Sequence, residues 1–195
     1  LHRTSRRQRQ MCIRDRTDKE SSIVHNNLKD MKDVLTYSLQ YQKGAWVLHM
    51  LRNYIGEDNF RKGIRNYYKK YYNSTTTTNQ FKTEMEVVSG MNLDTFFDQW
   101  LYKGGNMVLD GNWKFDEKKG RIEVNLNQVQ NDGYLFEMPV ELGISYNDKN
   151  LEKIQTVKLE KEKGRFYIAS DSKPISIKID PNTKLLAIWD FNEIK

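Results

Sequence analysis

The amino-acid sequence predicts an α+β fold in which a helical segment is followed by an antiparallel β-sandwich. Between about residues 39 and 103 the apolar residues recur every three or four positions, which is the spacing of one helix face. After Gly105 apolar and polar residues alternate, as is typical of half-buried strands. The chain has 195 residues, 37% of them hydrophobic, which is enough to bury a core in one large domain or two small ones.

Four helices are expected in the first part. Gly56, Gly90 and the pair Gly104-Gly105 are suited to end helices, and Thr78 and Asn92 to cap the third and fourth. The short loops between them make the helices close neighbours. Helix by helix, the residues predicted to face inward are Ala45, Leu48, Leu51 and Ile55; Phe60, Ile64, Tyr67 and Tyr71; Phe81, Met85 and Val88; and Leu93, Phe96, Phe97 and Trp100.

Short strands are expected in the second part, separated by turn sequences at intervals of about ten to fifteen residues. A final strand is expected over Leu185 to Phe191. Sequential short strands of this kind predict a small β-sandwich. The alternating sets before the final strand are Ile122, Val124 and Leu126; Met138, Val140, Leu142 and Ile144; Val157 and Leu159; Phe166 and Ile168; and Ile175, Ile177 and Ile179.

Positive charge is concentrated in residues 1–16. The formal net charge is +6, and this segment holds six arginines and one aspartate, so it carries +5 and leaves +1 for the rest. No nucleic-acid partner is predicted, because the segment lacks interleaved aromatic residues and an amphipathic period. The hexapeptide Met11–Arg16 looks like a translated sequencing adapter, so residues 1–16 are expected to be a non-native tail. The only cysteine, Cys12, lies in it, so no disulfide is predicted.

Spacing alone reveals no complete catalytic site. The three histidines, His2, His25 and His49, are not spaced four apart, and HExxH, glycine-rich phosphate loops and GxSxG are absent. His49 lies beside Leu48 and Met50 and is expected to be hydrogen-bonded and half-buried. No apolar run is long enough to cross a bilayer. Neither a metal site within this chain nor a transmembrane segment is therefore predicted.

A resemblance to a known family adds function. Residues Tyr41-Gln42-Lys43-Gly44-Ala45 and those that follow, through Arg52, resemble the YxKGAxxLxMLR segment of the aminopeptidase N family of zinc metallopeptidases, the thermolysin-like gluzincins. The likeness covers about residues 37 to 195. Further resembling segments follow in the family's order: Ile55-Gly56, Tyr67–Tyr72, Ser89-Gly90, Phe96–Leu101, Val108-Leu109, Asn127–Gln130 and Ile179–Pro181.

The resemblance implies a domain organisation and a cofactor. Residues 17–105 would be the all-helical C-terminal part of a thermolysin-like catalytic domain, and residues 106–195 the β-sandwich domain. In that family zinc is held by HExxH and a downstream glutamate, and a GxMEN-type loop binds the substrate's amino terminus. All of these precede the tyrosine segment, and this sequence contains none of them. The chain is therefore expected to be an N-terminally truncated fragment that is inactive alone.

Tyr41 matches the family's catalytic tyrosine. In the family this phenol stabilises the negatively charged tetrahedral intermediate, and a phenol with a pKa near 10 stays protonated as a neutral donor. Composition alone would favour an amphipathic tyrosine packed by its ring. Tyr37, one turn earlier, is expected to be structural, Lys43 and Gly44 to serve packing and close approach, and Trp46 to lie in the core.

Two other functions stay open at this point. One is a noncatalytic module in which the sandwich binds a peptide or glycan, because sandwiches serve many functions. The other is a related zinc hydrolase, such as an epoxide-opening enzyme, that uses the same tyrosine. The resemblance implies peptide substrates and slightly favours a periplasmic or secreted location. Side-chain preference and oligomeric state cannot be predicted from the sequence.

Overall fold

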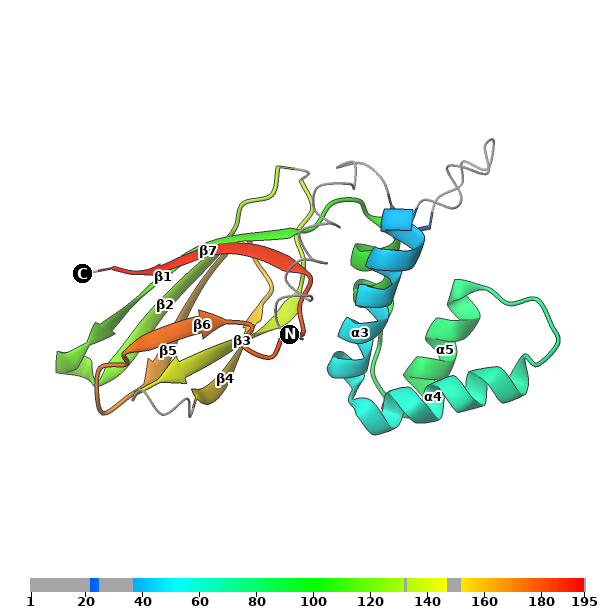
Figure 1. The fold of residues 1–195 in the computed structure, drawn as a ribbon, viewed down its shortest axis with the longest axis horizontal. Coiled ribbons are helices and arrows are strands. Elements are labelled where there is room, and N and C mark those ends of the chain that lie inside the picture. The colour runs from blue at the N-terminus through cyan, green and yellow to red at the C-terminus, as the bar shows by residue number, and fades with distance from the viewer. Residues whose placement is uncertain (1–21, 25–36, 132, 147–151, 195) are drawn as a thin grey trace. The chain divides into compact units, whose positions relative to one another are not determined.

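The computed structural model describes residues 22–24, 37–131, 133–146 and 152–194 and confirms the α+β class (Figure 1). The chain divides into two compact units between Gly104 and Gly105. We call them the helical unit and the β unit and describe each by itself. Residues 1–16, with the predicted adapter-like tail and Cys12, lie outside the described residues.

Among the residues that the structure describes, the helical unit contains α-helices and two π-helical segments, whose turns are wider than those of an α-helix. The segment η1 runs directly into α3, and α6 runs directly into η2, so each π segment forms one end of a longer helix. The elements are η1 (Tyr37–Lys43), α3 (Gly44–Ile55), α4 (Glu57–Lys70), α5 (Thr78–Ser89), α6 (Asp94–Phe97) and η2 (Asp98–Tyr102).

Glycines end α3 and α5 as predicted, whereas neither predicted polar cap is correct. Gly56 separates α3 from α4 with φ at 88°, and Gly90 ends α5 in the left-handed region. The cap of α5 is Thr77 rather than the predicted Thr78: its side chain accepts from the N–H of Gln80, whose side chain accepts from the N–H of Thr77. Four consecutive threonines offer the same side chain at each position, so the capping box with Gln80 selects among them.

The fourth helix also begins later than predicted. Asn92 does not cap it directly, because α6 begins at Asp94 after Leu93. The side-chain oxygen of Asn92 instead accepts from the N–H of Asp94 at 2.9 Å, two residues ahead. The Lys82 ammonium donates to the Asp94 carboxylate and lowers the pKa of that carboxyl, which ties α5 to the start of α6.

The core of the helical unit lies between α3, α5 and the α6–η2 helix. Trp100 is fully buried, and Phe96 and Phe97 are also buried as predicted. On α3 the buried face carries Val47, Met50, Leu51 and Ile55.

The predicted burial is wrong at two residues of α3. Ala45 and Leu48 are exposed, and the predicted core residue Trp46 is only half-buried. Residues 47, 51 and 55 and residues 45, 48 and 51 both have helical spacing, so the period alone cannot choose between the two faces.

Helices α4 and α5 form a hairpin. Gly63 faces α5 so closely that a Cβ there would lie 2.6 Å from the sulfur of Met85. Tyr67 packs edge-on against Phe81 at 5.2 Å. Lys70 donates to the buried carboxylate of Glu84 at 2.5 Å, which raises the pKa of Lys70. Ile64, predicted to face inward, lies on the exposed side of α4.

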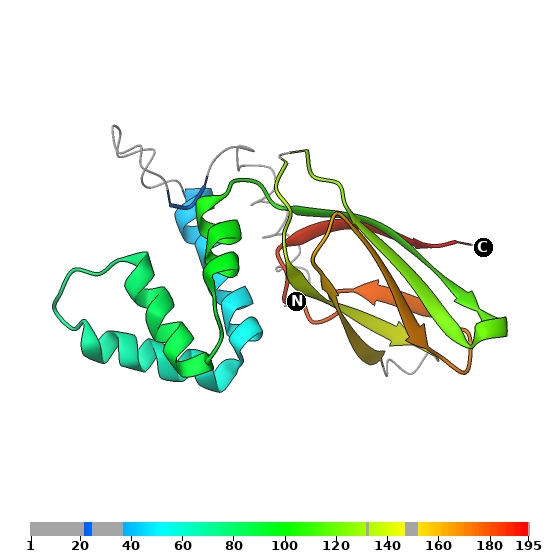
Figure 2. The same ribbon diagram turned by 180° about the vertical axis from the view of Figure 1, so that it is seen from behind.

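The β unit is a sandwich of two sheets (Figure 2). A four-stranded sheet has the order β5-β2-β1-β7, and a three-stranded sheet has the order β4-β3-β6. The strands are β1 (Met107–Asp116), β2 (Arg121–Gln128), β3 (Met138–Ser145), β4 (Glu152–Leu159), β5 (Lys163–Ala169), β6 (Ser176–Ile179) and β7 (Ala187–Glu193), with a short 3-10 helix, η3 (Glu117–Lys119), after β1.

The topology differs from the antiparallel prediction at one pair. Strand β7 pairs with β1 in parallel, with Leu109 opposite Trp189 and Gly111 opposite Phe191, whereas the other pairs are antiparallel. Alternation along each strand is local and says nothing about direction, so sequence could not predict this pairing. Strand β1 was not among the alternating sets either, because Asp110, Gly111 and Asn112 interrupt its apolar residues.

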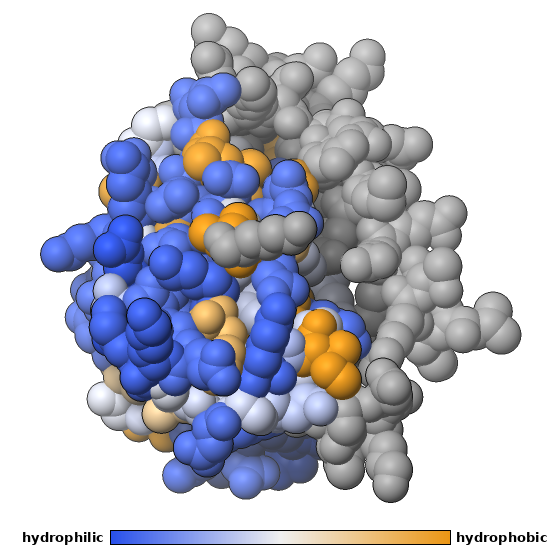
Figure 3. All heavy atoms as spheres, turned by 90° about the vertical axis from the view of Figure 1, so that its left-hand side faces the viewer, coloured by the Kyte–Doolittle hydropathy of each residue, from blue (hydrophilic) through white to orange (hydrophobic). Residues whose placement is uncertain are grey.

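The inner faces of both sheets form the core of the β unit. Ile122, Val124 and Leu126 of β2 and Val140 and Leu142 of β3 are completely buried, as their alternation predicts. The end of the β unit seen in Figure 3 is mainly hydrophilic, with small separate apolar patches.

Replacing Thr77 by alanine is expected to destabilise the protein by about 1 kcal/mol, because the N–H of Gln80 loses its capping partner. Thr75 is exposed in the same loop and is the matched control. Urea unfolding of both alanine variants measures the difference. Equal loss of stability in the two variants would show that the cap does not contribute.

Candidate active site

Tyr41 lies in η1, within a π-helical turn that continues as α3. The residue is 60% exposed, so Tyr41 is not enclosed in the core of the helical unit. π-helical turns are rare and often occur at functional sites. The surface exposure of this phenol is what a group that must reach a substrate requires.

Residues on either side of Tyr41 fix the backbone of η1. Ser38 and Leu39 are buried, and Lys43 has no exposed surface. Complete burial of a lysine is rare because its ammonium loses the solvation of water. The burial of these residues on one side of the turn leaves Tyr41 on the other.

A short segment joins η1 to η2. The N–H of Val24 donates to the carbonyl of Leu101 at 2.9 Å, and the side-chain amide of Gln40 donates to the carbonyl of Ile23 at 3.2 Å. Ser22 donates to the carbonyl of Val24 at 2.8 Å. Residues 22–24 therefore hold the turn that carries Tyr41 against the end of the last helix in the unit.

Two glutamines that no sequence pattern singles out flank Tyr41. The side-chain carbonyl oxygens of Gln40 and Gln42 are both buried and accept no hydrogen bond from any described residue. Buried amide oxygens normally have a donor. No sequence pattern marks these atoms, because their burial depends on how η1 packs.

The other residues considered in the sequence have structural positions. The buried Lys43 agrees with a packing role. Gly44 is not needed for close approach to any described residue, since an added Cβ would lie 3.7 Å from the carbonyl of Leu39, an ordinary contact. His49 is half-buried and lies 3.3 Å from the amide of Asn53, as predicted, and its ring packs edge-on against Trp46 with centroids 5.4 Å apart. The side chain of Tyr37 lies outside the described residues.

The described part of the chain contains no cluster of three or more histidine, cysteine, aspartate or glutamate residues able to hold a metal ion. None of the helices described is both long enough and apolar enough to cross a membrane. The candidate site therefore consists of a positioned phenol without a metal-ligand set around it among these residues.

A helical unit that carries an exposed tyrosine at the start of a helix and is followed by a β-sandwich is the arrangement that the aminopeptidase resemblance implies. The family model described as "Peptidase family M1 domain" matches residues 2–100. The chain therefore belongs to peptidase family M1. The match includes the arginine-rich segment, so the non-native origin of residues 1–16 stays a prediction.

Similar proteins extend the likeness beyond the matched residues. "Probable aminopeptidase 2" of Sulfurisphaera tokodaii is 31% identical over 142 residues, which are 73% of this chain and 17% of that protein. "Aminopeptidase N" of Lactococcus lactis is 27% identical over 131 residues, or 65% of this chain and 15% of that protein. The chain thus spans less than a fifth of either relative.

A solved structure shows the same fold. Aminopeptidase A of Legionella pneumophila, crystallised with aspartic acid, superposes with a TM-score of 0.74 over 88% of this chain and 20% of that chain. The two are 15% identical, so this likeness concerns the fold alone.

Removing the Tyr41 hydroxyl is expected to leave folding almost unchanged. Tyr41→Phe should shift the free energy of unfolding by less than about 0.5 kcal/mol, as surface substitutions usually do. Trp100→Ala, in the buried core, should destabilise by about 3–5 kcal/mol. Thermal or urea unfolding of both variants tests the contrast. A large loss in Tyr41→Phe would mean that the hydroxyl serves folding.

Proposed function

We propose that this chain forms part of a zinc-dependent aminopeptidase of family M1 and supplies Tyr41 as the hydrogen-bond donor that stabilises the tetrahedral intermediate. The observation that carries the proposal is the exposed phenol of Tyr41 on a turn fixed by buried neighbours, in a chain that belongs to this family. The relatives named aminopeptidases support peptides as the substrate class.

The chemistry follows from the charge that develops during peptide hydrolysis. Attack on the scissile carbonyl turns a neutral oxygen into a negatively charged one, and a donor aimed at that oxygen stabilises the transition state more than the substrate. The Tyr41 hydroxyl is neutral and donates one hydrogen bond without giving up its proton. It therefore positions and stabilises the oxygen rather than acting as an acid or base.

Rigidity of the donor matters as much as its chemistry. A donor held in place before the reaction does not have to reorganise when the charge appears. Tyr41 is followed without interruption by α3, and Val47, Met50 and Leu51 fix α3 in the core. Lys43 in the same turn is completely buried and so holds the backbone in place, whereas Tyr41 is exposed.

Family M1 is zinc-dependent in general, and the metal supplies the Lewis acid of the reaction. The described residues do not fit this metal by themselves, because they contain no ligand cluster. We propose that the zinc ligands, the general base and the groups that bind the substrate's amino terminus belong to sequence outside these 195 residues. The periplasmic or secreted location favoured by the resemblance stays a prediction.

Tyr41→Phe in the complete enzyme is expected to lower kcat about 10²- to 10³-fold, because one oxyanion donor is lost. Zinc content should stay the same, since Tyr41 is not proposed as a ligand. Steady-state kinetics on an aminoacyl anilide and metal analysis provide the two measurements. Tyr68→Phe removes the hydroxyl of a similarly exposed tyrosine in the same unit and serves as the control. Wild-type turnover in Tyr41→Phe would remove Tyr41 from the mechanism.

The 195-residue chain alone is expected to hydrolyse no aminoacyl anilide, with or without added zinc. Purified protein is assayed against the complete enzyme at equal concentration. Zinc-stimulated hydrolysis by the short chain would contradict the proposal. If the upstream coding sequence lacks HExxH and the downstream glutamate, the noncatalytic binding module becomes the better account.

A further inference from the structure

The α4–α5 hairpin carries a local charge that the chain's overall composition hides. The hairpin, residues 57–89, contains six lysines and arginines and four acidic residues, Glu57, Asp58, Glu84 and Glu86, so its net charge is +2. Three of the six have carboxylate partners: Arg61 pairs with Glu57, Lys70 with Glu84 and Lys82 with Asp94. The remaining three, Lys62, Arg65 and Lys69, have no carboxylate partner among the residues that the structure describes.

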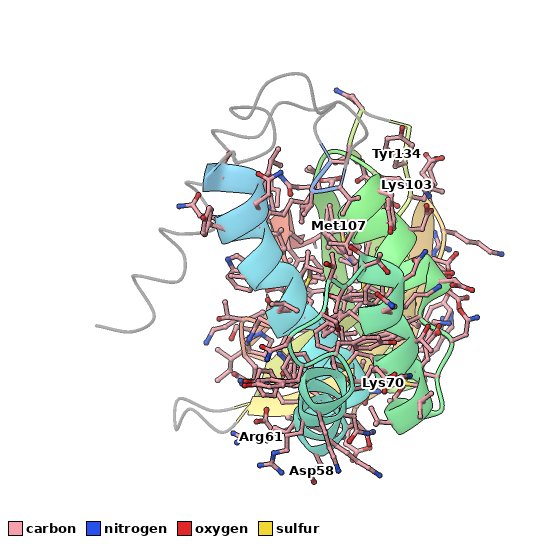
Figure 4. The ribbon with its side chains drawn as sticks, turned by 90° about the vertical axis from the view of Figure 1, so that its right-hand side faces the viewer. Asp58, Arg61, Lys70, Lys103, Met107 and Tyr134 are labelled. Carbon is pink, nitrogen blue, oxygen red and sulfur yellow. The ribbon has the colours of Figure 1, made fainter. Side chains whose placement is uncertain are left out.

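These three cations share one side of α4. At 100° per residue, positions 62, 65 and 69 lie within one narrow strip of the helix surface. All three side chains are exposed. Figure 4 looks along α4 and shows Arg61 and Asp58 pointing outward, while Lys70 lies beside α5. By the same geometry Asp58, which is also exposed, lies in this strip, so the side of α4 that turns away from α5 carries three cations and one carboxylate.

A stripe of exposed apolar side chains runs next to the cations. Ile64 and Tyr68 are one turn apart on α4, and Tyr72 follows just after the helix. Tyr68 and Tyr72 are 66% and 63% exposed and contact each other with ring centroids 5.6 Å apart. The side of α4 that packs on α5, through Gly63 and Tyr67, lies about 100° around the helix from this stripe. The stripe is thus not needed for the hairpin's own core.

We propose that this basic tyrosine face, formed by Lys62, Ile64, Arg65, Tyr68, Lys69 and Tyr72, binds the surface of an anionic lipid bilayer. The cations would contact lipid phosphates and carboxylates, and the tyrosine rings would lie at the level of the headgroups, where one end of the ring is apolar and the other wet. Ile64 adds apolar surface in the same stripe. This inference is independent of the role proposed for Tyr41.

The shape of the face favours a bilayer over another polyanion. A helix edge is convex and suits a flat surface, whereas proteins that hold single-stranded nucleic acid use a groove with aromatic faces open for stacking. Here the two rings meet at 62°, so the edge of one ring lies against the face of the other. Charge complementarity and this geometry together point to a membrane surface.

Binding of the 195-residue chain to vesicles tests the proposal. We expect it to bind phosphatidylcholine vesicles that contain about 30% phosphatidylserine and not vesicles of phosphatidylcholine alone. The triple variant Lys62→Gln, Arg65→Gln, Lys69→Gln should bind about 100-fold more weakly, because each removed cation contributes about a factor of five near an anionic surface. Tyr68→Ser with Tyr72→Ser should weaken the binding that persists when salt is added, because that part does not depend on charge.

A charge-matched control separates the face from general attraction. Lys118, Lys161 and Lys163 are exposed in the β unit, and changing all three to glutamine alters net charge equally. The arginine-rich segment is present in every variant and so contributes equally. Equal weakening by the two triple variants, or equal binding to both vesicle types, would overturn the proposal. Stronger, face-dependent binding to single-stranded oligothymidine or polyglutamate would also overturn it, in favour of a different partner.

Discussion

The position of Tyr41 depends on burial of the residues beside it in the same turn. Ser38, Leu39 and Lys43 are buried in the helical unit, Gln40 and Gln42 are half-buried, and Tyr41 is exposed. A buried lysine tolerates few alternative arrangements, because its charge must be compensated wherever it lies. The burial of these neighbours fixes the backbone to which the exposed side chain of Tyr41 is attached.

The two π-helical segments extend that constraint across the unit. Segment η2 contains the buried residues Gln99 and Trp100, and η1 contains the tyrosine. Residues 22–24 join them through Val24 to Leu101 and Gln40 to Ile23. The position of Tyr41 on η1 therefore depends on a contact with Leu101, about sixty residues later in the sequence.

The sequence could predict features that depend on local chemistry. The spacing of the apolar residues changes from helical to alternating where the helical unit ends and the β unit begins. Gly56 and Gly90 end helices because the backbone conformations there suit glycine. Predictions were wrong where two patterns are equivalent. The cap of α5 is Thr77 and not Thr78, and Val47 rather than Leu48 faces inward on α3. Each alternative has the same local spacing, so only tertiary packing decides.

The candidate site could not be predicted from local chemistry in this way. Tyr41 could be singled out only through the family resemblance, since its spacing and residue type are ordinary. The sequence could not predict the complete burial of Lys43 or of the side-chain carbonyl oxygens of Gln40 and Gln42, because burial depends on how the folded unit packs. The parallel pairing of β1 with β7 was unpredictable for the same reason.

That parallel pair also affects how the β unit assembles during synthesis. Strand β1 lies between β2 and β7, and its second edge stays open until residues 187–193 have left the ribosome. Non-local pairings of this kind form slowly, because a long loop must close first. While the intervening strands are being made, β1 therefore presents an unpaired edge of the kind that chaperones protect from aggregation.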